Sequence, residues 1–241
     1  RSLAEIDAYG EAADWISARM GFFADNLLVQ SWDAWLAYQT NDPEKALRIY
    51  DVLFNSGHRD NDDFSAYMDL LADAGRWDDL DRKFAEYTAD DVDDETLLLQ
   101  VQLLTRRERY EDALTLLDRW EKLDPDDGEI ARMYAITHLK LGQPLEAATY
   151  IQSILDTVEG NGHEKALAVK RLLAQESSTE DGLMVLDALN KADPGNQHML
   201  LLQARYAAQL EKYDYALELL DQVLEIVATE LTRNDLAQLL V

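Results

Sequence analysis

The residues that could carry out chemistry are few and widely spaced. The chain contains no cysteine, and its four histidines lie far apart, at His58, His138, His163 and His198. No two of them form the HxxxH spacing that places two imidazoles on one helix face for a metal ion. We find no GxxxxGK[ST] phosphate loop and no GxSxG nucleophile elbow. The acidic runs at 89–95 and 124–129 lack the DxDxDG pattern of a calcium loop. The sequence therefore predicts a non-enzymatic protein with no metal and no cofactor.

The overall charge limits the class of partner. The 241 residues include 48 acidic and 22 basic side chains, for a net charge of −26. Phosphate backbones and anionic lipid surfaces are repelled by such a surface, so the charge predicts no nucleic-acid partner. Two interpretations stay open: the charge serves solubility, or it attracts a cationic partner.

The elements that would position a binding surface are indicated by an internal repeat. Six small or apolar residues follow one another at intervals of 34, 33, 34, 35 and 34 residues. They are Ala46, Leu80, Ala113, Ala147, Gly182 and Ala216. A period this steady indicates stacked copies of one supersecondary unit.

The clearest copy is residues 108–127. Tyr110, Ala113, Leu117 and Trp120 follow spacings of three, four and three, as on one face of an α-helix. The preceding residues, 95–107, carry a second apolar helical stripe, so the unit reads as helix, tight turn, helix. In the last copy the same packing stripe comprises Tyr213, Ala216, Leu220 and Val223. We expect the small residue to let the two helices approach closely.

This unit resembles the tetratricopeptide repeat family, whose repeat is a helix–turn–helix of 34 residues. The resemblance implies an all-α fold, a right-handed α-solenoid of about six repeats with a half-repeat at each end. One departure is the family's usual glycine in the first helix, which is replaced in every copy by Ala34, Met68, Val101, Ala135, Lys170 and Ala204. Pentatricopeptide repeats have a similar period, but they bind single-stranded RNA, and the acidic charge argues against that.

The repeat predicts one superhelical domain over residues 1–241, with no Ser/Gly-rich linker. The expected repeats are 27–60, 61–93, 94–127, 128–162, 163–196 and 197–230. Residues 3–20 resemble the second helix of an earlier repeat, and 231–241 resemble the start of a next first helix. We therefore expect a fragment of a longer protein. No apolar run is long enough to span a bilayer, so direct membrane insertion is not expected.

In this family the first helices line the concave face, where partners usually dock. The residues expected there are Trp35, Tyr38, Asp69, Asp73, Arg106, Arg132, Lys140, Arg171 and Arg205. The predicted groove is acidic toward its N-terminal half and cationic toward its C-terminal half. Alternatively, the arginines pair within their own helices, as Arg132 can with Glu129, and the aromatic residues are buried.

The resemblance implies a protein–protein interaction scaffold or adaptor of bacterial type that holds a partner peptide or protein in its groove. Two alternatives are left open. One is a periplasmic segment of an exopolysaccharide secretion or envelope assembly protein, which would bind a cationic polysaccharide. The other is a structural spacer or oligomerisation element. The sequence does not choose between the periplasm and the cytoplasm of a bacterium.

Overall fold

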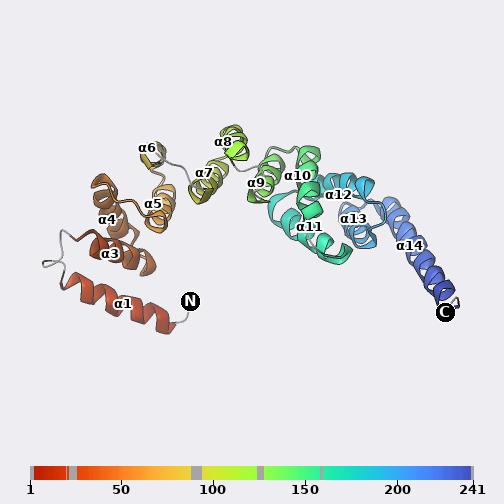
Figure 1. Ribbon diagram of the computed structural model, residues 1–241, viewed down its shortest axis with the longest axis horizontal. Helices are drawn as coiled ribbons and strands as arrows, with labels where there is room; N and C mark the ends of the chain where they lie inside the picture. The colour runs from red at the N-terminus through yellow and green to blue at the C-terminus, as the bar shows by residue number, and fades with distance from the viewer. Residues whose placement is uncertain are drawn as a thin grey trace. The chain divides into compact units, whose positions relative to one another are not determined.

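The computed structural model describes residues 3–19, 21, 26–87, 94–123, 128–157 and 160–239. Within these ranges every regular element is an α-helix, and consecutive helices are joined by short connections (Figure 1). The predicted all-α fold built from helical repeats is therefore confirmed.

The described helices pair in chain order into hairpins. The bounds are α1 (Leu3–Ser17), α3 (Leu27–Gln39), α4 (Pro43–Asn55), α5 (Asn61–Asp73), α6 (Trp77–Tyr87), α7 (Asp94–Arg106), α8 (Tyr110–Leu123), α9 (Gly128–Lys140), α10 (Pro144–Thr157), α11 (Gly162–Glu176), α12 (Thr179–Ala192), α13 (Gln197–Gln209) and α14 (Tyr213–Leu239). The successive helices joined by a short turn, here called hairpins, are α3–α4, α5–α6, α7–α8, α9–α10, α11–α12 and α13–α14. Helix α1 packs against α3.

The helices fall into two compact units, residues 1–103 and 104–241. The core of the first unit is rich in aromatic residues and includes Tyr50, Phe64, Tyr67 and Phe84. The core of the second unit is mainly aliphatic and runs through α9 to α14. Each unit thus has a continuous apolar core along its stack, as expected when neighbouring repeats bury one another's faces.

One turn geometry recurs within the hairpins. In five of the six, a single residue in the left-handed region ends the first helix: Asn41, Gly75, Glu108, Gly142 and Glu211. In each case the next residue donates its N–H to a carbonyl five residues earlier, as Gln143 does to His138. This is the Schellman termination of a helix. The α11–α12 turn differs, because Ser178 caps α12 with its side chain instead.

The repeating small residue lies where helices approach most closely. Ala46, Ala113 and Ala147 have no exposed surface. At Gly182 on α12, a Cβ atom would lie 2.5 Å from Cε1 of Tyr206 on α13. The expected role of this position is therefore visible in its geometry, because a larger side chain would push the neighbouring helix away.

A second recurring contact joins one hairpin to the next. The Asp five positions after the small residue accepts a hydrogen bond from the residue 16 positions further on, in the following first helix. Tyr67 donates to Asp51, and Tyr134 donates to Asp118 at 2.6 Å. Burial, followed by the hydrogen bond to Asp118, raises the pKa of Tyr134 above its usual range.

The third contact of this kind uses an amide. Gln203 donates to Asp187 at 3.3 Å and to the hydroxyl of Tyr215 at 2.8 Å, while Tyr215 donates to Asp187 at 3.0 Å. Burial raises the pKa of Tyr215 to about 12, with a further contribution from its bond to Asp187. Burial acts to raise the pKa of Asp187, but the bonds from Lys191, Tyr215 and Gln203 outweigh it, and the pKa is lowered.

The last helix departs from the predicted pattern in two ways. Helix α14 continues to Leu239, although the sequence suggested a new helix from residue 231. The segment 225–235 contains no glycine or proline that would end a helix. Tyr213 and Leu220, expected on the packing stripe, are exposed, while the neighbouring Leu219 is buried.

We predict that Tyr134→Phe lowers the free energy of unfolding by about 1 kcal/mol, because Asp118 loses a hydrogen-bond donor. A raised tyrosine pKa adds stability below its ordinary value of 10, and this stability is lost as the pH rises toward the folded-state value. Between neutral and strongly alkaline pH, the free energy of unfolding should therefore fall less in Tyr134→Phe than in the unaltered chain. Urea melts at several pH values measure both effects. Tyr213→Phe is the control, and equal losses in the two variants would contradict the role given to Tyr134.

We also predict that Gly182→Ala destabilises the chain by about 1–3 kcal/mol, because the new methyl group must displace the stiff Tyr206 ring. Gly128→Ala is the matched control, since no atom lies within 4 Å of its added Cβ. Thermal melts of both variants test this contact. If Gly182→Ala left the melting temperature unchanged, the two helices would be able to move apart without loss of stability.

Candidate partner-binding site

One concave surface of the second unit lies between two successive first helices, α11 and α13. Both helices begin at a capped N-terminus. The side chain of Asn161 accepts from the backbone N–H groups of His163 and Glu164, and the Glu164 carboxylate accepts from the backbone N–H of Asn161. Asn196 caps α13 in the same role. The caps fix the first turn of each helix and hence the histidine that follows each cap.

The caps place His163 and His198 side by side. Their ring centroids are 5.1 Å apart, with the ring planes at 69°. The helix starts also approach closely, because a Cβ on Gly162 would lie 2.7 Å from the side-chain oxygen of Asn196. This end of the groove therefore presents two imidazoles next to two helix N-termini, whose dipoles favour negative charge.

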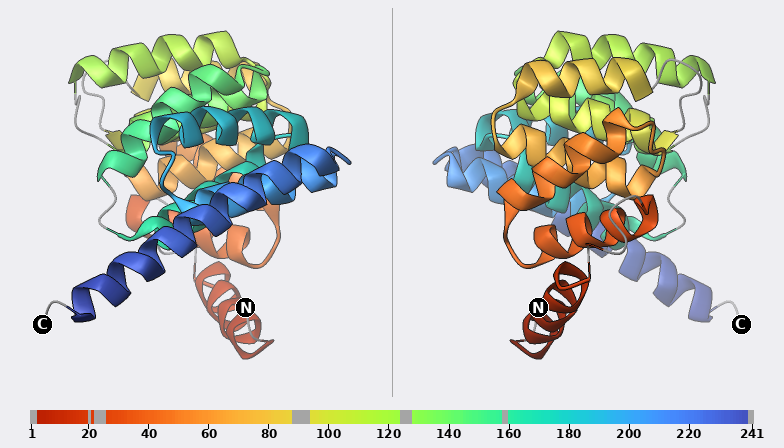
Figure 2. Two further views of the ribbon diagram at one scale, coloured as in Figure 1. Left: turned by 90° about the vertical axis from the view of Figure 1, so that its right-hand side faces the viewer. Right: turned by 90° about the vertical axis from the view of Figure 1, so that its left-hand side faces the viewer.

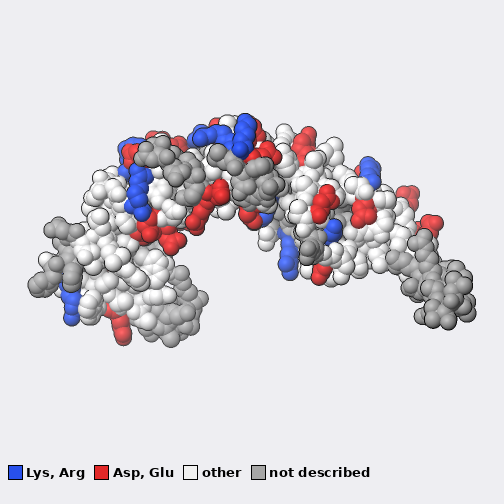
Figure 3. Space-filling view, in the orientation of Figure 1, with Lys and Arg blue, Asp and Glu red and all other residues white. Residues whose placement is uncertain are grey.

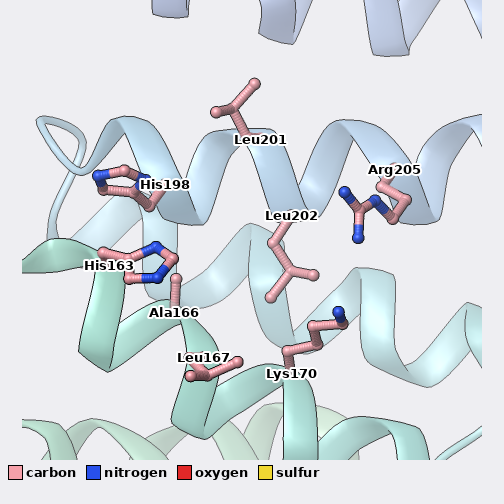
Figure 4. A pocket seen from close by; sticks show the side chains of 8 residues that line it. All are labelled: His163, Ala166, Leu167, Lys170, His198, Leu201, Leu202 and Arg205. Atoms are coloured by element: carbon pink, nitrogen blue, oxygen red, sulfur yellow. The ribbon is translucent and has the colours of Figure 1, made fainter.

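The groove continues from the histidines along both helices. It encloses a cavity of about 250 Å³, lined by His163, Ala166, Leu167, Lys170, His198, Leu201, Leu202 and Arg205. In Figure 4 the ends of Lys170 and Arg205 lie at the opposite end from the histidine pair, with Leu202 between the two groups. Neither cation forms an ion pair with any residue that the structure describes. The groove therefore combines an apolar floor with cationic and hydrogen-bonding groups at its two ends.

A second hollow lies between α9, α10 and α11. Its volume is about 230 Å³, and its floor is aliphatic, with Ile151, Leu155 and Val169 among the lining residues. Arg132 and Arg171 line it from successive first helices. Two of the predicted arginines are thus brought to one cavity, while Arg205 belongs to the neighbouring groove.

Some of the predicted cations have acidic partners within the chain. Arg132 pairs with Glu129 at 2.8 Å on the same helix. Lys140 at the end of α9 pairs with Glu176 at the end of α11 at 3.0 Å. Both side chains are partly neutralised, and the Arg132–Glu129 pair is the one that the alternative interpretation from the sequence described. Arg171 forms no ion pair with any described residue.

The remaining predicted residues lie on helices closer to the N-terminus. Trp35 is half-buried on α3, and its ring contacts Tyr9 on α1 with centroids 5.4 Å apart. Tyr38 is exposed on the same helix, while Asp69 is half-buried and Asp73 exposed on α5. Arg106 is the exposed last residue of α7. The groove with an acidic N-terminal half and a cationic C-terminal half stays a prediction.

Three groove residues were missed by the sequence analysis: His163, Lys170 and His198. Lys170 was noted only as a replacement for the family's glycine, and the histidines were not assigned to a site. The signal was nevertheless present, because His163 and His198 are 35 residues apart, as are Lys170 and Arg205. The first residues of α11 and α13, Gly162 and Gln197, are also 35 residues apart, so these side chains occupy equivalent positions on adjacent helices.

On the face shown in Figure 3, both acidic and basic side chains of the described residues occur in small groups separated by uncharged residues. Within those residues no group of three or more His, Asp or Glu side chains is arranged to hold a metal ion. No helix in the described ranges is long and apolar enough to cross a membrane.

Comparison with known proteins gives one family match. Residues 94–137, which cover α7 and α8 and most of α9, match the family model described as tetratricopeptide repeat. No curated protein matches the chain in sequence.

Several solved structures resemble the chain in fold. A tetratricopeptide repeat protein from Parabacteroides merdae ATCC 43184 is 16% identical, with a TM-score of 0.53, and the match covers 90% of this chain and 78% of that one. The Cut9–Hcn1 structure of the APC/C is 10% identical with a TM-score of 0.49, covering 94% and 46%. The pilF protein of Pseudomonas aeruginosa is 20% identical with a TM-score of 0.41, covering 88% and 90%. The first of these shows that the chain has the fold of a tetratricopeptide repeat protein.

Proposed function

Because the chain has the fold of a tetratricopeptide repeat protein, we propose that it is a protein-interaction scaffold whose α11–α13 groove binds an acidic segment of a partner protein. The observation that carries the proposal is the pair Lys170 and Arg205. Both are exposed on adjacent first helices, and neither has an acidic partner among the described residues, although the chain as a whole has a net charge of −26. Cations left without internal partners in so acidic a protein can pair with an anionic ligand.

The chemistry of the groove fits an extended peptide with carboxylates. Arg205 can hold a carboxylate through two parallel N–H bonds, and Lys170 can add a point charge beside it. The imidazoles of His163 and His198 supply further donors at the other end of the groove. Leu167, Leu201 and Leu202 offer apolar contact between these ends. An acidic peptide with an apolar side chain between its carboxylates would meet all three parts.

Arg171 extends the proposed surface toward the second hollow. It lies one position beyond Lys170 on α11 and lines the cavity that also contains Arg132. A partner segment longer than the α11–α13 groove could continue there. The N-terminal candidates Trp35, Tyr38, Asp69 and Asp73 are proposed separately to contact a basic or apolar segment of a partner, as the sequence suggested.

We predict that reversing both groove cations, Lys170→Glu with Arg205→Glu, weakens binding of an acidic peptide by more than about tenfold, or about 1.4 kcal/mol. The probe is a fluorescent peptide of alternating Asp, Glu and Leu residues, measured by anisotropy at low and moderate salt. Affinity of the unaltered chain should fall as salt screens the attraction. The melting temperature should stay within a few degrees, because both side chains are exposed.

The matched control reverses two exposed cations on α8, Arg119→Glu with Lys122→Glu, and so changes the net charge equally. Binding should survive in this control. Arg171→Glu tests the second hollow separately. If the acidic peptide binds equally well after reversal of Lys170 and Arg205, the groove is not the docking site. Preferential binding of a chitosan oligosaccharide would instead favour the envelope-assembly alternative.

A further inference from the structure

The outer face of α14 carries an apolar stripe that no described residue covers. Tyr213, Leu217, Leu220 and Leu224 are 61%, 59%, 38% and 66% exposed. Their spacings of four, three and four residues place them on one side of the helix. Figure 2 (left) looks onto this end of the second unit, where α14 lies in front of the other helices. A row of three leucines and a tyrosine in water is a recognised mark of an interaction surface.

The same positions are buried in the two preceding hairpins, on α12 and α10. Counting from the small residue of each copy, Leu217, Leu220 and Leu224 correspond to Leu183, Leu186 and Asn190 on α12. On α10 the equivalents are Ala148, Ile151 and Leu155. All six are buried, because α10 packs against α12, and α12 packs against α13. The stripe on α14 is therefore the stacking surface of the repeat, exposed at the last described hairpin. Its natural occupant is another amphipathic helix.

The charge beside the stripe restricts that occupant. Each stripe residue is followed by an acid, and Asp214, Glu218, Asp221 and Glu225 form a second row along one edge of the stripe. All four are exposed, and none forms an ion pair with a described residue. A helix docked on the leucines would lie next to these carboxylates. Lysine or arginine along its facing edge would be attracted, and acidic residues there would be repelled.

We propose that the outer face of α14 binds a basic amphipathic helix of a partner protein, which continues the stack. The occupant presents apolar side chains at the stripe's spacing and a row of Lys or Arg on the edge that faces the acids. A second copy of this chain fits less well. Antiparallel pairing of two α14 helices would bring both acidic rows to the same side, and each chain carries a net charge of −26. This surface is separate from the α11–α13 groove proposed above for acidic segments.

The test uses the full chain and two synthetic helical peptides of about 18 residues, or five turns. Both have leucines at spacings of four, three and four. One has lysines along the adjoining edge, and the other has glutamates there. Anisotropy should show the lysine peptide binding at least about tenfold more tightly than the glutamate peptide, a difference of about 1.4 kcal/mol. Equal binding of the two peptides would overturn the assignment of a basic partner.

Variants locate the binding surface. Leu217→Ser with Leu224→Ser should lower the affinity for the lysine peptide by at least about tenfold. The melting temperature should stay unchanged, because both side chains are exposed. The matched control is Val52→Ser with Leu145→Ser, two apolar residues that are each 56% exposed on other helices. Glu218→Gln with Asp221→Asn should weaken binding and flatten its salt dependence. Unchanged binding in the double serine variant would overturn the proposal.

Two further readouts separate this proposal from its alternatives. The Lys170→Glu with Arg205→Glu variant should bind the lysine peptide as the unaltered chain does. A negative result for acidic peptides at the α11–α13 groove therefore leaves the proposal for α14 unchanged. Sedimentation should show a monomer. A dimer that Leu217→Ser with Leu224→Ser dissolves would assign the stripe to a second copy and overturn the assignment to a partner helix.

Discussion

The close approach of helices at the small residue of each repeat is the contact on which the other features depend. Where Gly182 meets the ring of Tyr206, there is no room even for a methyl group. The same position is fully buried at Ala46, Ala113 and Ala147. Once this spacing is set, the aspartate five residues later comes within hydrogen-bond reach of the next first helix. The first helices also become near neighbours, which creates the α11–α13 groove.

Much of the fold could be read from the sequence, because the interval between small residues reports a physical spacing. The helices of each hairpin follow from two apolar stripes, and the turns follow from residues that tolerate the left-handed region, such as Gly75 and Gly142. The extent of α14 could not be read in this way. A helix continues through any segment that contains no residue able to end it, so the period alone does not show where the last helix stops.

The candidate site was only partly predictable. Arg205 and Arg171 were chosen because they lie on the expected inner stripe, and the structure places each at a concavity. Lys140 was chosen by the same rule, but it pairs with Glu176 across two helices, a contact that no local spacing reveals. Lys170 and the histidines were missed because their importance depends on what the adjacent repeat presents. Comparing equivalent positions in successive repeats would have found all three.

The junctions between successive hairpins of the second unit are not alike. Hydrogen bonds to Asp118 and Asp187 join α8 to α9 and α12 to α13. The equivalent pair between α10 and α11 is Gln152 and Ala168, and there Gln152 bonds to Asp156 on its own helix instead. The polar link that the structure describes across this junction is the partly exposed ion pair of Lys140 on α9 with Glu176 on α11, and such a pair between long side chains holds an angle less tightly than a hydrogen bond from a buried residue. Bending of this stack should therefore concentrate between α10 and α11. The hairpins on either side of that junction should move as pairs rather than singly.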